Sequence, residues 1–196
     1  MGTLNSYFSL TKPRVVILLQ ITALCSVLSH DLIGESGVSM ETLKIMSIVM
    51  IGGYLTAGGA NTINMWYDRD IDPIMTRTSN RPLSTGEIEA NSALVFGILM
   101  SIGGTIWFSL FTNYVATFWA VFSILFYVLI YSMFLKRKTP QNIVVGGIAG
   151  STPPLIGWAA AENNLVIETS SIKSFLESII YLGPHDFLGS FPLMPW

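Results

Sequence analysis

The chain has 196 residues, of which 51% are hydrophobic and only 11% are charged, and its mean hydropathy is +0.58. Soluble globular domains carry about 25% charged residues, so this composition excludes an ordinary soluble domain and indicates a membrane protein. A single cysteine excludes an internal disulfide and a cysteine-based metal cluster. The net charge of −2 gives no reason to expect nucleic acid as a partner, and the expected surroundings are a lipid bilayer.

Five apolar stretches follow one another along the chain, and each is predicted to cross a membrane. They cover roughly residues 14–30, 45–64, 92–112, 115–135 and 143–161. The absence of Asp, Glu, Lys and Arg between residues 92 and 135 leaves room for two spans of about 20 residues. The spans are expected to be helical, because open strands cannot satisfy their backbone in lipid. The sequence therefore predicts an all-α fold, a polytopic transmembrane helix bundle.

The basic residues fix an expected orientation of this bundle. With the N-terminus in the cytoplasm, the outer loops between the first four spans contain one basic residue, Lys44. The basic residues on the inner side are Lys12, Arg14, Arg69, Arg77, Arg81, Lys136, Arg137 and Lys138. This bias satisfies the positive-inside rule and predicts a multi-pass protein of the plasma membrane with a cytoplasmic N-terminus and a cytoplasmic second loop.

The chain divides into a membrane region and a tail of different character. Residues 1–161 contain all five predicted spans, and we expect them to form one unit. The segment 162–196 begins polar, and its later apolar run is interrupted by Glu177, Pro184 and Asp186. We interpret it as a divergent tail that contains at most an incomplete sixth helix.

The second loop begins with the most informative pattern in the chain. If this segment is helical, Asn64, Asp68 and Asp72 are spaced at i, i+4 and i+8 and form one column on a helix face. An amide and two carboxylates are the oxygen ligands that Mg²⁺ prefers, with room left for water and phosphate. We therefore predict that these three residues are catalytic and bind a metal.

Basic side chains follow this column and are candidates for holding the anion that the metal bridges. Arg69, Arg77 and Arg81 are the main candidates for binding a diphosphate, and Lys12 and Arg14 at the start of the first span are weaker ones. The triplet 136–138 is interpreted mainly as a topology anchor. The aromatic residues of the third and fourth spans are expected mostly to pack or to face lipid, although a few ring faces could shield a carbocation.

Several stretches resemble a known family, the UbiA-type intramembrane prenyltransferases, and within it the protohaem IX farnesyltransferases, also called haem O synthases. The matching stretches lie in the family's order over about residues 4 to 161. They are Leu-Thr-Lys-Pro-Arg at 10–14, Asn-Thr-Ile-Asn-Met-Trp-Tyr-Asp-Arg-Asp-Ile-Asp at 61–72, Arg77 with Asn-Arg-Pro-Leu at 80–83, Leu-Lys-Arg-Lys-Thr-Pro-Gln-Asn at 135–142, and Gly-Gly-Ile-Ala-Gly at 146–150 with Pro-Pro-Leu-Ile-Gly-Trp at 153–158.

The resemblance implies a bundle of nine helices with two Asp-rich cytoplasmic sites. It also implies the reaction, in which the farnesyl group of farnesyl diphosphate is joined to a vinyl group of haem B to form haem O. The implied cofactor is Mg²⁺, and other membrane proteins of the haem pathway are suggested as partners. The second Asp-rich site of the family is not found in this sequence. We therefore expect a C-terminally truncated family member with five to six of the nine helices and half of the diphosphate site, and the activity of the chain alone stays open.

Two alternatives remain open from the sequence. One is a prenyltransferase of the same superfamily with another acceptor, such as an aromatic acid or an ether-lipid precursor. The other is a non-catalytic membrane subunit, in which Asp68 and Asp72 could be replaced without loss of function.

Overall fold

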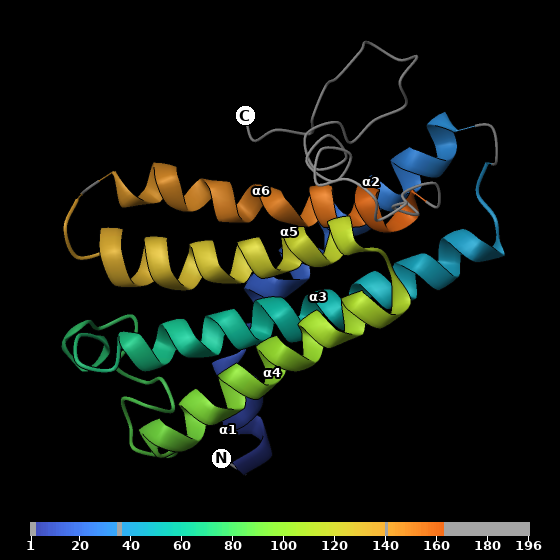
Figure 1. The fold of residues 1–196 in the computed structure, drawn as a ribbon. Coiled ribbons are helices and arrows are strands. Elements are labelled where there is room, and N and C mark those ends of the chain that lie inside the picture. Colours follow the sequence, from blue (N-terminus) through green and yellow to red (C-terminus); the bar gives the residue numbers. More distant parts are fainter. Residues whose placement is uncertain (1–2, 35–36, 140, 163–196) are drawn as a thin grey trace.

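The computed structural model describes residues 3–34, 37–139 and 141–162, and this part of the chain is helical without strands (Figure 1). Its elements are α1 Thr3–Leu10, α2 Pro13–Ile33, α3 Met40–Tyr67, the 3-10 helix η1 Asp72–Ile74, α4 Ala90–Phe111, α5 Tyr114–Leu125, the π-helix η2 Phe126–Leu135, and α6 Asn142–Ala161. The predicted all-α fold is confirmed. The predicted tail lies, apart from Glu162, outside the described residues.

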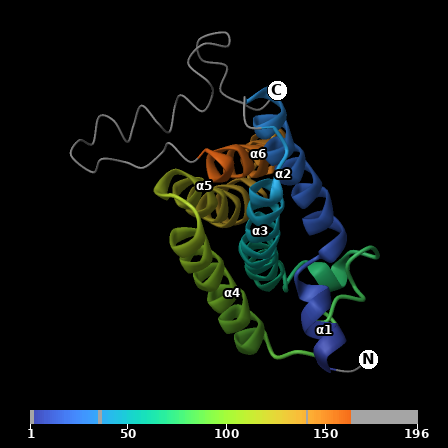
Figure 2. The same ribbon diagram turned by 90° about the vertical axis from the view of Figure 1, so that its right-hand side faces the viewer.

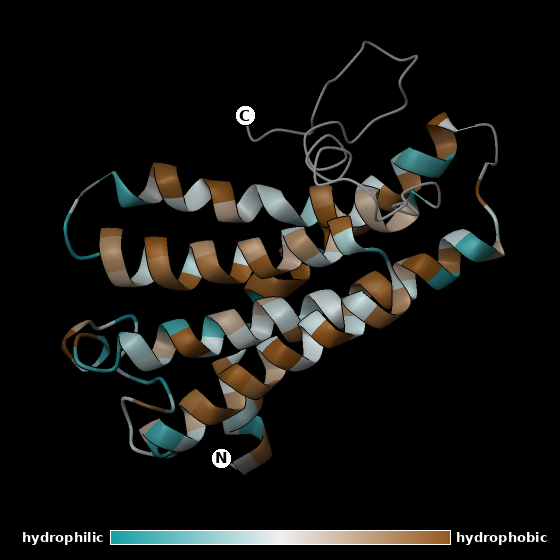
Figure 3. Cartoon of the chain, in the orientation of Figure 1, coloured by the Kyte–Doolittle hydropathy of each residue, from teal (hydrophilic) through white to brown (hydrophobic). Residues whose placement is uncertain are grey.

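Four segments of the described part are long and apolar enough to cross a membrane: α2, α3, α4, and the continuous run Tyr114–Leu135 of α5 and η2. Hydrophilic residues gather mainly at the two ends of the bundle, and brown apolar residues cover much of α4 and α5 between them (Figure 3). The fifth predicted span does form a helix, α6, but it is not among these four. Helix α6 contains four glycines and two prolines among its 20 residues.

Helix α3 is the centre of the bundle and lies between α2 and α4 (Figure 2). Its small residues allow neighbouring helices to approach closely. A Cβ atom added to Gly59 would lie 2.7 Å from the Gly97 carbonyl oxygen of α4. The contact of α2 with α6 is similar, because a Cβ atom on Gly157 would clash with the carbonyl oxygen of Ala23.

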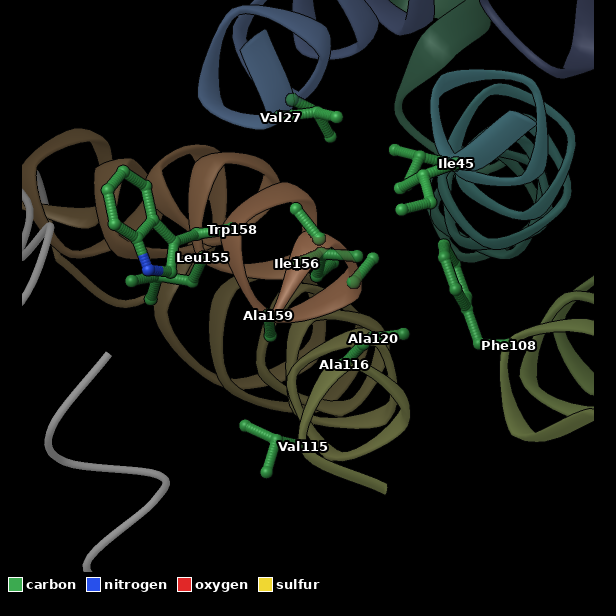
Figure 4. Packing of buried hydrophobic residues seen from close by; sticks show 14 residues of the cluster. Val27, Ile45, Phe108, Val115, Ala116, Ala120, Leu155, Ile156, Trp158 and Ala159 are labelled. Carbon is green, nitrogen blue, oxygen red and sulfur yellow. The ribbon is translucent and has the colours of Figure 1, made fainter. Parts of the chain in front are cut away.

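The largest apolar cluster joins all five long helices at the end of the bundle away from the Asp-rich loop. Figure 4 shows Val27 of α2, Ile45 of α3 and Phe108 of α4 facing the small residues of α5 and the apolar face of α6. Phe108 has no exposed surface and points from α4 toward α3. This cluster fixes the helices relative to one another, and it thereby fixes the polar residues at the opposite end.

Candidate functional site

The column of Asn64, Asp68 and Asp72 is not carried by a single helix, so that part of the prediction is wrong. Helix α3 ends at Tyr67, Asp68 is its C-cap, and Asp72 is the first residue of η1. Pro73 prevents the α-helix from continuing through this loop, because a proline lacks the backbone N–H and in an α-helix its ring would clash with the carbonyl oxygen of Arg69. The helical spacing of the three residues is nonetheless kept, because each is joined to the next by an i to i−4 backbone hydrogen bond. The Asp72 amide donates to the Asp68 carbonyl at 2.9 Å, and the Asp68 amide donates to the Asn64 carbonyl at 3.0 Å.

All three of these residues are buried. Asn64 is 2% exposed, Asp68 is 0% exposed and Asp72 is 2% exposed. A solvated helix end would leave such side chains in water, and burying a carboxylate is costly unless it is paired or hydrogen-bonded. The surrounding residues must therefore supply the partners.

Asn64 is held between two helices by a donor on one side and an acceptor on the other. The Lys12 ammonium donates to Asn64 Oδ1 at 2.7 Å, and Asn64 Nδ2 donates to Ser132 Oγ at 2.9 Å. Ser132 Oγ in turn donates to the Tyr127 carbonyl at 2.8 Å. Because an ammonium can only donate and the Ser132 hydroxyl hydrogen is already used, the amide orientation is determined: the Asn64 oxygen faces Lys12.

Lys12 lies at a sharp break between α1 and α2. It is a non-glycine residue with a positive φ of 53°, a conformation that costs about 1 kcal/mol or more and is found preferentially at functional sites. Pro13 follows it as the first residue of α2. Burial of the ammonium is the main reason that the pKa of Lys12 falls to about 8, the nearby charges of Arg81 and Lys136 lower it further, and Asp68 and Asp72 oppose the shift.

The π-helix η2 brings two residues to the site that the sequence analysis did not select. Its widened turn is visible in the bond from the Lys136 amide to the Tyr131 carbonyl, five residues back, at 2.9 Å. Ser132 and Lys136 are one turn apart at its end, and they face Asn64 and Asp68 of α3. Such wide turns are often found at functional sites, and the periodicity of the sequence does not predict them.

Each buried carboxylate has its own cation. The Lys136 ammonium donates to Asp68 Oδ2, and Arg81 Nη1 donates to Asp72 Oδ2 at 2.6 Å. The sequence analysis interpreted Lys136 mainly as a topology anchor, and the structure adds that its ammonium reaches back into the bundle. Its position directly after the fourth span, on the same side as the Asp-rich loop, was the available signal.

Arg137 ties the loop after η2 to the loop after α3. Its guanidinium donates to both oxygens of Asp70, at 2.6 and 2.8 Å, and to the Tyr67 carbonyl at 2.9 Å. It also lies 4.4 Å from the centre of the Tyr67 ring. The hydrogen bond to Arg137 is the main reason that the pKa of Asp70 is lowered. This contact holds the neighbouring Lys136 against the end of α3.

The remaining predicted basic residues lie outside the buried cluster. Arg14 and Arg77 are exposed, and the exposed Arg69 folds back onto its own helix end, donating to the Trp66 carbonyl at 2.9 Å. The structure thus brings together Lys12, Asn64, Asp68, Asp72 and Arg81 from the predicted set, and it adds Ser132 and Lys136. The roles of Arg14, Arg69 and Arg77 stay predictions.

The chemistry of this cluster fits a hard divalent cation. Asp68 Oδ1 is buried and has no hydrogen-bond partner among the described residues, so one carboxylate oxygen is open to a ligand. Within that part of the chain no group of three or more His, Cys, Asp and Glu side chains is arranged to hold a metal. Two carboxylates and an amide would leave several positions to water and phosphate, as is usual for Mg²⁺.

Comparison with known protein families identifies the family of this chain. The model of the UbiA prenyltransferase family matches residues 20–187 of the chain. The chain belongs to the UbiA prenyltransferase family. This confirms the resemblance found in the sequence and agrees with a multi-pass helical membrane protein.

Curated members of the UbiA family are similar to the chain over most of its length. The protohaem IX farnesyltransferase of Streptomyces coelicolor is 46% identical over 161 residues, covering 82% of this chain and 49% of that protein. The protohaem IX farnesyltransferase of Bartonella henselae is 41% identical over 182 residues, covering 91% of this chain and 54% of that protein. The chain therefore spans about half the length of the curated relatives that it matches.

A solved structure of the same fold is also similar. It comes from a study of the biosynthesis of digeranylgeranylglyceryl phosphate synthase in membranes, and it aligns with a TM-score of 0.71 and 25% sequence identity. The alignment covers 83% of this chain and 55% of that chain.

Proposed function

We propose that this chain carries the allylic diphosphate site of a protohaem IX farnesyltransferase, in which the farnesyl group of farnesyl diphosphate is transferred to a vinyl group of haem B to form haem O. The observation that carries the proposal is the buried cluster of Asn64, Asp68 and Asp72 among three cations at one end of an apolar bundle. The names of the two curated relatives described above support the choice of substrates.

The charges of the cluster suit a polyanion with a bound metal. Lys12, Arg81 and Lys136 carry three positive charges against the two carboxylates, so the cluster has an excess of one positive charge at neutral pH. We infer that Asn64, Asp68 and Asp72 would hold Mg²⁺, and that Lys136 and Arg81 would move from the carboxylates to diphosphate oxygens. When bound, Mg²⁺ would neutralise charge on the leaving diphosphate.

The reaction breaks the allylic carbon–oxygen bond, the π bond of the haem vinyl group and one O–H bond of water, and it forms a carbon–carbon bond and a carbon–oxygen bond. The allylic carbon–oxygen bond breaks and the diphosphate leaves with the electron pair, while the vinyl carbon of haem B forms a carbon–carbon bond with the farnesyl carbon. Water then adds to the resulting cation, forming a carbon–oxygen bond and releasing a proton to solvent. The protein's cations stabilise the charge that grows on the departing oxygens, and such electrostatic stabilisation usually lowers the barrier more than any other effect.

We infer that the site opens to the cytoplasm. The basic residues at the site end of the bundle favour this orientation through the positive-inside rule, and the site would then be reached by water-soluble diphosphate groups. The plasma membrane is the proposed location, and other membrane proteins of haem synthesis are proposed partners.

Binding of farnesyl diphosphate to the purified full chain tests the proposal. Calorimetric titration in detergent with Mg²⁺ should show binding that EDTA abolishes and that Asp68→Asn weakens at least about 100-fold, the size expected when a group contacting charge is removed from a buried site. Asp31→Asn is the matched control, because Asp31 is also buried but lies at the other end of α2, where it accepts a hydrogen bond from Thr42 at 2.5 Å. Equal binding by wild type and Asp68→Asn would contradict the proposal.

A second experiment separates the possible acceptors. Extraction of haem from membranes that contain the chain, supplied with farnesyl diphosphate, should yield haem O. The fold likeness to digeranylgeranylglyceryl phosphate synthase favours an ether-lipid precursor as the next candidate, and prenylated lipid with unchanged haem would support it. A prenylated aromatic acid would indicate the other alternative acceptor. Full function of the doubly substituted Asp68→Asn, Asp72→Asn chain would indicate a non-catalytic membrane subunit instead.

A further inference from the structure

An open groove lies on the surface of the bundle between α1 and the first turns of α4. Helix α1 and the start of α4 lie at the same end of the molecule (Figure 2). Two residues of α1 and five of α4 line the groove, and none of them belongs to the buried polar cluster. Its volume is about 620 Å³, within the range of about 300–1,000 Å³ that sites for small organic ligands usually have.

An aromatic contact forms the floor of this groove. Tyr7 of α1 meets Phe96 of α4 edge to face, with ring centres 5.0 Å apart, and both rings pack against a small buried apolar cluster. The apolar lining residues beside this floor, Leu4, Val95 and Leu99, are exposed. The groove is therefore preformed, and its sides offer apolar surface to an occupant.

The lining changes from polar to apolar along α4. Asn91 and Ser92 line one end of the groove, and Leu99 lies about 12 Å further along the helix axis. That distance fits within one leaflet, which is half of a hydrocarbon core of about 30 Å. Figure 3 shows the same change, with hydrophilic colour at the start of α4 and hydrophobic colour in the turns that follow. A membrane lipid has this polarity when its head group lies at the helix start and an acyl chain runs inward.

The polar end of the groove offers hydrogen-bond donors to an anion. The Glu89 carbonyl accepts from the Ala93 amide at 3.0 Å, but no side chain caps α4. The first N–H groups of the helix are therefore open, and such groups favour a phosphate. The side chains of Asn91 and Ser92, on the same turn, are exposed and form no hydrogen bond within the described residues. A lipid phosphate at this turn would have several donors.

Two carboxylates beside this end determine which head group fits. Glu87 accepts from Ser6 Oγ of α1 at 2.6 Å, and Glu89 is the residue before α4. Both are exposed, and in the part of the chain that the structure describes neither forms an ion pair. The three aspartates of the same loop are instead each paired with a lysine or an arginine. Unpaired carboxylates favour a ligand with a positive charge, and an ammonium donates hydrogen bonds to them that a quaternary amine does not.

We propose that this groove binds a phospholipid with an ethanolamine head group. Its phosphate lies at the first turn of α4, its ammonium faces Glu87 and Glu89, and one acyl chain runs along Val95 and Leu99. The bound lipid holds α1 against α4, and it thereby supports Lys12, which lies two residues after α1. The inference does not rest on the proposed reaction, because no residue of the groove belongs to the polar cluster.

Native mass spectrometry of the full chain in detergent tests the choice of lipid. The chain is mixed with equal amounts of phosphatidylethanolamine, phosphatidylcholine and phosphatidylglycerol that carry the same acyl chains. Wild type should retain the ethanolamine lipid about fivefold more than either other lipid, the size expected for exposed ion pairs. Glu87→Gln combined with Glu89→Gln should remove this preference. The matched control is Glu41→Gln, which removes an exposed carboxylate at the other end of the bundle and should keep the preference.

A second pair of variants tests the groove itself. Val95→Trp fills the groove from an exposed position and should remove most of the retained ethanolamine lipid. Ile106→Trp adds the same ring at an exposed position of α4 outside the groove and should leave retention unchanged. Unchanged retention in Val95→Trp, or equal retention of the three lipids by wild type, would overturn the inference. Mg²⁺-dependent binding of farnesyl diphosphate should be the same in all these variants, so it tests the proposed function separately.

Discussion

The pair of Lys136 and Asp68 supports a quantitative prediction, because one partner is completely buried. The Asp68 side chain is 0% exposed and the Lys136 side chain is 28% exposed. Removing one partner of a fully buried ion pair costs about 3–5 kcal/mol. Because Lys136 is partly in solvent, we reduce this figure for screening and expect Lys136→Met to lower the free energy of unfolding by about 2–3 kcal/mol.

A double-mutant cycle isolates the interaction from the individual side chains. Lys136→Met, Asp68→Asn and the double variant are unfolded in detergent, and their free energies of unfolding are compared with that of wild type. The double variant should lose less than the sum of the single losses, by more than about 1 kcal/mol, since its remaining amide is neutral. Lys44→Met removes an exposed pair with Glu41 and should cost less than about 0.5 kcal/mol.

The result that would refute the reasoning is additivity. If the two single losses sum to the double loss within about 0.5 kcal/mol, the two charges do not interact in the folded chain. The assignment of Lys136 to the buried cluster would then be wrong, whatever the substrate.

Three further predictions concern the surroundings of the site and the bundle itself. Ser132→Ala should weaken Mg²⁺-dependent binding of farnesyl diphosphate about tenfold, because the Asn64 amide loses its hydrogen-bond acceptor. Ser132→Thr keeps a hydroxyl and should retain the affinity of wild type. Equal affinities of wild type and Ser132→Ala would contradict this role of Ser132. Gly157→Ala should destabilise the bundle by about 1–3 kcal/mol, because the added methyl group meets the backbone of α2, while Gly147→Ala, with open space around it, should stabilise by about 0.5–1 kcal/mol. Since Arg137 lowers the pKa of the Asp70 carboxyl, this pair contributes stability above the carboxyl's unfolded value, and the contribution is lost as pH falls through the lowered folded value. The difference in melting temperature between wild type and Arg137→Gln should therefore shrink from pH 7 to pH 3, and a constant difference would count against the pair.

Much of the architecture follows from periodicity and composition alone. The scarcity of charge between residues 92 and 135 predicted two neighbouring spans, and the structure has α4 there followed by α5 and η2. Glycines permit close helix contact, and α4 packs directly on Gly52 and Gly59 of α3 while Gln20 of α2 lies against Gly53. Both features depend on residues that are close together in the sequence. Lipid requires long apolar helices, and small residues allow two helix backbones to approach each other.

By itself, the sequence determined that this is a helical membrane bundle with an oxygen-rich, cationic cluster after its second span, because apolar length and the spacing of Asn64, Asp68 and Asp72 are properties of the chain. Only the tertiary structure decided which cations meet those oxygens. The end of α3 at Tyr67, the left-handed conformation of Lys12 and the wide turn of η2 each rotate side chains by amounts that residue spacing does not encode. They bring Lys12, Ser132 and Lys136 to the buried end of α3 and leave Arg14 and Arg77 in solvent.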